Sequence, residues 1–158
     1  MDLRIEALGK EKGPAIWFLN QLVIIKASGK QTGNAFCLVE MVTPVGGGAP
    51  YHVHRADDET FYVLEGQLEF ISGARRFTGG PGTSVFLPRN IPHGFRVVGT
   101  SPARFLVFSA PAGFDEFVTE AGVPATSLTL PAPSDPDMAK LKSLAAKHQI
   151  ETLGPLPV

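Results

Sequence analysis

Three histidines and one glutamate have the residue types and spacing of a transition-metal site. His52 and His54 are separated by one residue, so on a β-strand both imidazoles leave the same face. Glu59 follows five positions later, and His93 begins a later apolar segment. Three imidazoles and a carboxylate bind divalent iron, manganese, nickel, cobalt, copper or zinc. We therefore expect one divalent transition metal per chain with open positions for catalysis. Taken alone, the same residues could also be ordinary surface or core histidines.

Short strands separated by turn residues must position these side chains. Apolar runs alternate with clusters of Gly, Pro, Ser and Asn, and no helical period lies between them. This pattern predicts an all-β barrel or sandwich. The expected strands cover residues 16–26, 34–43, 51–54, 60–64, 67–71, 75–78, 84–87, 93–98 and 104–109.

The character of the chain changes after Ala110. Residues 111–122 are predicted to form a short helix. A second helix, capped by Ser134 or Asp135, is expected to end near His148. We therefore divide the chain into a β-barrel domain, residues 1–110, and a helical tail, residues 111–158, packed on the outside of the barrel.

The spacing around the candidate ligands resembles the two sequence motifs of the cupin superfamily. In the first motif a glycine, a His-x-His pair, a glutamate and a second glycine are separated by five, four and six residues. In the second motif a proline follows a glycine after five residues, and a histidine comes five positions after the proline. The eight positions in register are Gly46, His52, His54, Glu59, Gly66, Gly82, Pro88 and His93.

Two positions depart from the cupin pattern. Asn90 stands where the second motif has glycine, and Asn tolerates a left-handed backbone better than other non-Gly residues. Val97 stands where the motif ends in asparagine. That position is not a metal ligand, so its change bears on the choice of substrate.

The resemblance implies a cupin (jelly-roll) β-barrel carrying two short C-terminal helices, with the metal held by the three histidines and Glu59. It also implies a homodimer, because Val53, Tyr62 and Leu64 are expected to face outward and would need covering.

Alternation along the ligand strands predicts an apolar substrate pocket. The side chains expected to face inward beside the metal are Phe61, Val63, Phe95 and Val97. On the strand at 34–43 the inward face is either that of Phe36 or that of Cys37, and the pattern leaves both open. No Lys or Arg falls on an assigned inward position, which argues against phosphorylated sugars and small dianions as substrates.

Three function classes fit these features. The first is a quercetinase-like dioxygenase acting on an apolar aromatic or enolisable small molecule, with Glu59 as both ligand and general base. The second is a non-oxidative isomerase or lyase that uses the metal as a Lewis acid. The third is a non-catalytic small-molecule-binding cupin. The apolar pocket favours the dioxygenase. Asp57 and Asp58 are interpreted as a charged turn.

The composition limits the possible partners. The chain has 158 residues and a net charge of −1, from 14 basic and 15 acidic residues, so no basic field is available for nucleic acid or an anionic membrane. Cys37 is the single cysteine, so no internal disulfide can form and a reducing compartment is favoured. We expect a cytoplasmic protein with a small-molecule substrate.

Overall fold

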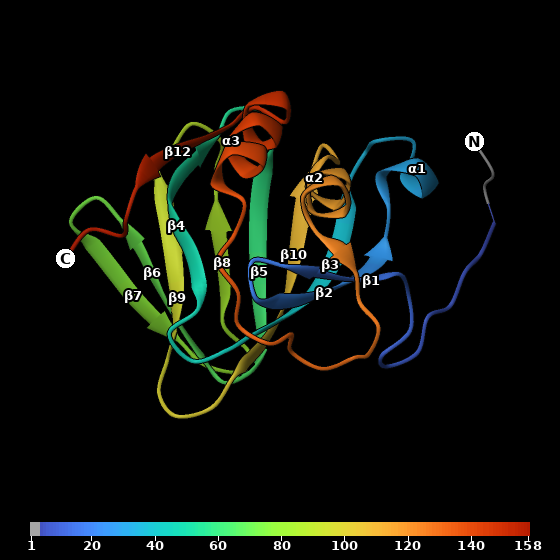
Figure 1. Ribbon diagram of the computed structural model, residues 1–158, viewed down its shortest axis with the longest axis horizontal. Helices are drawn as coiled ribbons and strands as arrows, with labels where there is room; N and C mark the ends of the chain where they lie inside the picture. Colours follow the sequence, from blue (N-terminus) through green and yellow to red (C-terminus); the bar gives the residue numbers. More distant parts are fainter. Residues whose placement is uncertain (1–3) are drawn as a thin grey trace.

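Two antiparallel sheets face each other in the computed structural model, which describes residues 4–158. Figure 1 shows them side by side, with two helices above. The larger sheet has the strand order β11-β1-β2-β3-β10-β5-β8, and the smaller has the order β12-β4-β9-β6-β7. The all-β architecture predicted from the sequence is confirmed.

The elements have the following bounds. The larger sheet contains β1 (Ala15–Phe18), β2 (Gln21–Ala27), β3 (Cys37–Thr43), β5 (Asp58–Glu65), β8 (Ser84–Leu87), β10 (Ala103–Ala110) and β11 (Val123–Pro124). The smaller sheet contains β4 (Gly48–His54), β6 (Gln67–Ser72), β7 (Arg75–Gly79), β9 (His93–Val98) and β12 (Ile150–Gly154). The helices are α1 (Gly29–Thr32), α2 (Phe114–Ala121) and α3 (Met138–Lys147).

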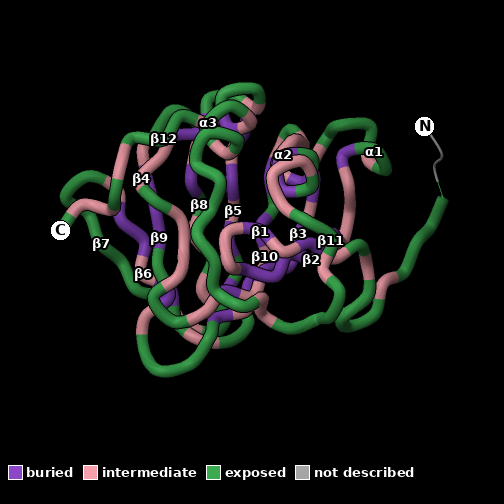
Figure 2. Tube along the Cα trace, in the orientation of Figure 1, coloured by how far each residue is buried: buried purple, intermediate pink, exposed green. Residues whose placement is uncertain are grey.

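A cluster of phenylalanines occupies the core between the sheets. The ring of Phe61 on β5 lies 5.2 Å from those of Phe70 and Phe95 and 5.4 Å from that of Phe105, measured between centroids. The first two partners belong to the smaller sheet, so these contacts join the sheets directly. Buried residues concentrate on the strands, as Figure 2 shows. Each buried Phe stabilises the fold by about 1.5–3 kcal/mol relative to an exposed one.

The first expected strand, residues 16–26, is in fact a hairpin. β1 and β2 are joined by Leu19 and Asn20, whose φ angles are 49° and 62°. A two-residue turn with positive φ at both positions suits the right-handed twist of paired strands. The apolar run around the turn concealed it, because Leu seldom adopts this backbone conformation.

The C-terminal tail contributes strands as well as helices. β11 pairs with β1 of the larger sheet, and β12 pairs with β4 of the smaller one. The predicted cap at Ser134 or Asp135 is wrong, since the side chain of Asp137 accepts a hydrogen bond of 3.0 Å from the amide of Lys140 and starts α3 there. The division of the chain at residue 110 remains a prediction.

Part of the surface expected to face a second copy is exposed. Tyr62 and Leu64 on β5 are 45% and 38% exposed, and Phe86 on β8 is 62% exposed. Val53, by contrast, is fully buried within the chain and needs no partner to cover it. The homodimer stays a prediction. Within residues 4–158, no helix is long and apolar enough to cross a membrane.

Candidate metal centre

The four predicted ligands come together between the two sheets. β4 carries His52 and His54, and β9 places His93 directly opposite His52 in the register of the smaller sheet. Glu59 reaches the cluster from β5 of the larger sheet. One ligand atom from each of the four residues lies within 4.8 Å of the other three.

The Nε2 atoms of the histidines point toward the centre of the cluster. The Nε2 atoms of His52 and His54 are 3.1 Å apart. Oε2 of Glu59 lies 3.2 Å from Nε2 of His54 and 3.3 Å from Nε2 of His93. His54, Glu59 and His93 are each at most 3% exposed, whereas His52 keeps part of its surface accessible.

Each imidazole is oriented by a hydrogen bond at Nδ1, the ring nitrogen that faces away from the centre of the cluster. Nδ1 of His52 donates to the carbonyl oxygen of Pro50 at 2.7 Å, and Nδ1 of His93 donates to that of Ile91 at 3.0 Å. Nδ1 of His54 donates to a carboxylate oxygen of Asp57 at 3.1 Å. Because each Nδ1 faces an acceptor, the neutral rings carry their proton there and direct the Nε2 lone pair inward. Metal-binding histidines in proteins are oriented by such outer hydrogen bonds.

The electrostatics of the cluster favour a positive charge at its centre. Burial, reinforced by the neighbouring His54 and His93, lowers the pKa of His52 to about 4, so its Nε2 remains a lone-pair donor at neutral pH. Burial also opposes the charged forms of Glu59 and His54, but their mutual attraction outweighs it. The pKa of Glu59 is therefore lowered and that of His54 is raised.

This donor set fits a divalent transition metal. Inward lone pairs and a carboxylate at separations of 3.1–3.3 Å repel one another unless a proton or cation lies between them. Imidazole nitrogen and carboxylate oxygen are ligands that first-row metals accept, and they do not distinguish one such metal from another.

Comparison with known proteins identifies the domain that contains the cluster. Residues 39–109 match the family described as the cupin domain. This chain carries a cupin domain.

Known proteins related to this cupin domain are distant. The chain is 30% identical over 86 residues to quercetin 2,3-dioxygenase from Bacillus subtilis, a match that covers 54% of the chain and 26% of that protein. It is also 30% identical over 74 residues to an uncharacterized protein from Methanocaldococcus jannaschii, covering 47% of the chain and 59% of the relative. The chain thus spans about a quarter and about three fifths of these two relatives.

A solved structure shares the fold of the cupin domain. The crystal structure of a predicted oxalate decarboxylase from Thermotoga maritima superposes with a TM-score of 0.60 at 18% identity. The match covers 68% of this chain and 99% of that one. At this identity the likeness concerns the fold alone.

An apolar cavity of about 80 Å³ opens beside the histidine cluster of the cupin domain. Of the four pocket residues predicted from the sequence, Phe61 and Phe95 line it. Val63 and Val97 instead belong to the buried core cluster and are not among the lining residues. The strand at 34–43 turns Cys37 and Val39 into the interior, while the cavity wall on that strand is Met41.

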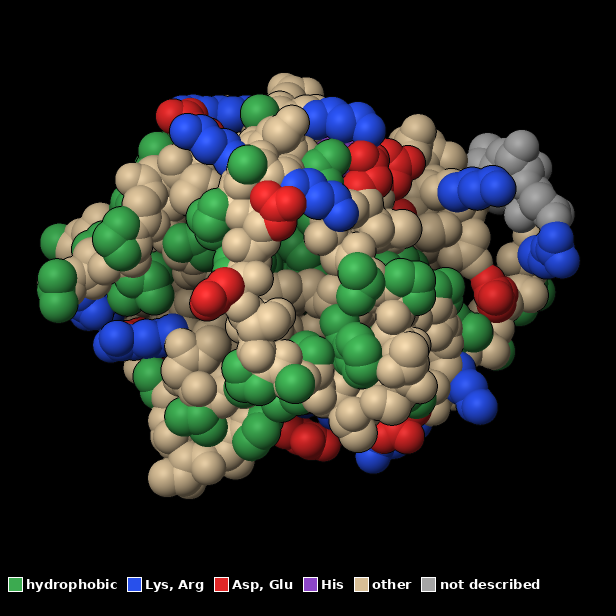
Figure 3. Space-filling view, viewed as in Figure 1, with side chains coloured by type: hydrophobic (Ala, Val, Ile, Leu, Met, Phe, Trp, Pro, Cys, Tyr) green, Lys and Arg blue, Asp and Glu red, His purple; other side chains and the backbone are tan. Residues whose placement is uncertain are grey.

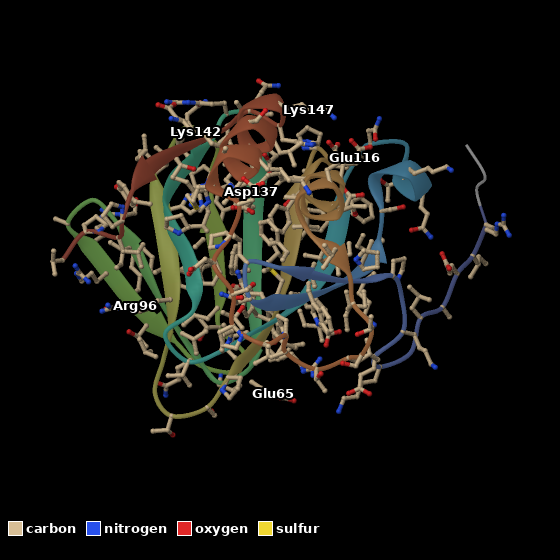
Figure 4. All side chains as sticks on the ribbon, in the orientation of Figure 1. Glu65, Arg96, Glu116, Asp137, Lys142 and Lys147 are labelled. Atoms are coloured by element: carbon tan, nitrogen blue, oxygen red, sulfur yellow. The ribbon has the colours of Figure 1, made fainter. Side chains whose placement is uncertain are left out.

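Sequence reasoning missed the part of the wall that comes from the tail. α2 contributes Phe114 and Phe117, and α3 contributes Leu141 and Ala145. Three charged residues of these helices, Glu116, Lys142 and Lys147, are exposed and lie on the outer side of the molecule in Figure 4. The apolar stripe of α3 was visible in the sequence, but not the surface that it covers. The tail therefore forms part of the cavity wall.

The two acidic residues between the ligand strands have different surroundings. Asp58 is partly exposed and forms an ion pair with Arg89 at 3.1 Å, as expected of a charged turn. Asp57 lies in the same turn, but it is 7% exposed and its side chain is hydrogen-bonded to His54. Asn90 adopts a φ of 66°, the left-handed conformation predicted for this departure from the cupin pattern.

Proposed function

We propose that this protein is a metal-dependent dioxygenase that acts on a small apolar molecule bearing a phenol or enol oxygen. The supporting observation is the cavity itself, whose aromatic and aliphatic wall ends at His52, His54 and Glu59. No Lys or Arg occurs among the lining residues, all of which lie in the described part of the chain. The distant similarity to a quercetin dioxygenase agrees with this proposal.

His52, His54, Glu59 and His93 would hold the metal. When bound, it would supply a Lewis-acidic, redox-capable centre for the substrate oxygen and for dioxygen. The rings of Phe61 and Phe95 would bind the apolar body of the substrate, at about 25 cal/mol for each Å² of apolar surface removed from water. The tail helices would exclude bulk water from the same space.

The lining discriminates by charge and by size. A phosphate or dianion would find no cationic partner in the wall, and burying it unpaired would cost several kcal/mol. A cavity of about 80 Å³ has room for several water molecules but is smaller than the roughly 300 Å³ of sites that enclose drug-sized ligands. We therefore favour a substrate with one ring or a short β-diketone over a three-ring flavonol.

The surroundings of Glu59 support its role as a ligand more strongly than its role as a base. Its pKa is lowered by His54 and His93, so the carboxylate is ionised at neutral pH and available to a cation. A general base works best with a pKa near the operating pH. Proton abstraction by Glu59 therefore stays a prediction, which the substitution described in the Discussion tests.

Oxygen consumption tests the proposed reaction. Protein loaded in turn with each candidate divalent metal would be placed in an oxygen electrode with catechols, β-diketones and flavonols. We expect substrate-dependent oxygen uptake that disappears in His52→Ala. His148→Ala is the matched control, because His148 lies on the tail and bonds to Glu120 at 3.2 Å, outside the cluster.

Two outcomes would contradict the proposal. Equal turnover of a good substrate with and without oxygen would establish the isomerase or lyase instead. Full retention of stoichiometric metal after His52→Ala and His54→Ala are combined would refute the ligand assignment itself.

A further inference from the structure

Asp57 is a buried acid whose side chain contacts a histidine of the metal cluster. Its Oδ1 accepts the hydrogen bond from Nδ1 of His54, and its Oδ2 is buried with no hydrogen-bond partner. Arg89 is electrostatically coupled to Asp57, but its hydrogen bonds go to Asp58 and to the carbonyl oxygen of Ala110. A buried carboxylate oxygen without a donor is costly, so its presence calls for an explanation.

The hydrogen-bond acceptor at Nδ1 of His54 is of a different chemical type from the acceptors at Nδ1 of His52 and His93. His52 and His93 each donate to a backbone carbonyl two residues earlier in the chain. These acceptors are neutral, and they are present whatever the side chains around them. His54 alone depends on a side chain, and that side chain bears a negative charge. A carboxylate behind a metal-bound imidazole fixes the ring and increases its strength as a ligand.

Two buried acids, Asp57 and Glu59, lie next to His54. Four acids in the described chain are buried: Glu40, Asp57, Glu59 and Asp115. Glu40 pairs with Arg104 and Lys26, and Asp115 accepts a hydrogen bond from the amide of Gly29. The remaining two, Asp57 and Glu59, both contact His54. When both are ionised, their two negative charges match those of one divalent cation.

We propose that Asp57 is a positioning residue of the metal centre, orienting His54 through Oδ1 and supplying the second negative charge that matches the site to a divalent cation. This inference rests on the proposed metal function. It extends the site beyond its four ligands to a fifth residue, which lies outside the cluster and is held in place by the turn between β4 and β5.

Three substitutions separate orientation from charge. Asp57→Asn keeps an acceptor oxygen and removes the charge, whereas Asp57→Ala removes both. Asp58→Asn is the matched control, because it makes the same chemical change at the adjacent, partly exposed acid. Two quantities would be measured for each protein: the affinity for Zn²⁺ by competition with a chromophoric chelator, and the Nδ1–H resonance of His54 by ¹⁵N-edited NMR, in metal-free and Zn²⁺-loaded protein.

The expected results form a graded series. Zn²⁺ affinity should fall about 10-fold in Asp57→Asn and up to about 100-fold in Asp57→Ala, and change less than twofold in Asp58→Asn. The slowly exchanging Nδ1–H signal of His54 should persist in Asp57→Asn and vanish in Asp57→Ala. The corresponding signals of His52 and His93, which depend on backbone acceptors, should survive in every variant.

Other results would overturn the inference. An unchanged Zn²⁺ affinity in Asp57→Ala, or a persistent Nδ1–H signal, would show that Asp57 has no part in the site. If Asp57→Ala fails to fold, Asp57→Asn decides, and a Zn²⁺ affinity within twofold of the parent overturns the charge-balancing role. If the parent protein binds no divalent metal, both the proposed function and the charge-balancing role of Asp57 fail. The NMR spectra of the metal-free proteins still test separately whether Asp57 orients the ring of His54.

Discussion

Replacing Phe61 with Ala should cost the fold much of its stability. Its ring is 3% exposed and contacts three other phenylalanine rings from both sheets, at 5.2–5.4 Å between centroids. Truncating a buried aromatic residue costs about 3–5 kcal/mol. We expect the upper part of that range, because each aromatic pair adds about 0.5–1.5 kcal/mol beyond burial. For a domain of this size a loss of about 4–5 kcal/mol lowers the melting temperature by roughly 8–20 °C.

Urea denaturation of the metal-free protein, followed by the fluorescence of Trp17, would give the free energy of unfolding. Phe86→Ala is the matched control, since the side chain of Phe86 is 62% exposed on the neighbouring strand β8 and should cost less than about 1 kcal/mol. A loss below about 2 kcal/mol for Phe61→Ala would refute the reasoning, because it would mean that the rings around the cavity are loosely packed.

Three further predictions test other parts of the structure. Glu59→Gln in metal-loaded protein should lower the rate at least about 100-fold if Glu59 also transfers a proton, and a metal-loaded variant with nearly the parental rate would exclude that role. Burial raises the pKa of Cys37 from about 9 to about 11. The contribution of the buried thiol to the free energy of unfolding should therefore be fully present below pH 9 and fall by up to about 3 kcal/mol as the pH rises to 11. Urea midpoints measured across this pH range should show that part of the decline in the parent protein and not in Cys37→Ala. Gly48→Ala should lower the free energy of unfolding by roughly 3 kcal/mol and reduce the metal content, because the new Cβ would lie 2.0 Å from the carbonyl oxygen of Phe95 and push β4 away from β9. Gly46→Ala is the control, since its Cβ would meet no atom within 4 Å, and this variant should lose less stability and keep the metal.

The basic side chains on one face of the molecule are dispersed. Lys and Arg side chains are scattered along the edges of the face in Figure 3 and form no continuous positive patch there. The net charge of −1 led us to expect neither nucleic acid nor an anionic membrane as a partner, and that expectation stays a prediction.

The sequence alone predicted the four residues that the structure brings together, from strand alternation for His52 and His54 and from the spacing of the cupin motifs for Glu59 and His93. Strand alternation puts His52 and His54 on one face, whatever the rest of the fold does. The left-handed φ of Asn90 could be predicted from the conformational preference of that residue type. Most strand positions followed for the same reason, since apolar alternation and turn residues act over a few positions. The turn at Leu19 and Asn20 escaped detection because the residues around it continue the apolar run.

Only the tertiary structure decided what surrounds those ligands. Alternation predicts that Phe61 and Val63 both face inward, but it does not say where packing fills the interior and where it leaves a cavity. Ala145 lines the cavity although it lies 86 positions after Glu59 in the chain. It does so because α3 is followed by β12, which pairs with β4 and so places the helix beside the barrel. The burial of Asp57 likewise depends on chain segments remote in sequence, since burial is a property of everything that packs around a residue. Local patterns and motif spacing therefore predicted the residues of the cluster, and long-range packing determined the cavity beside it and the burial of Asp57.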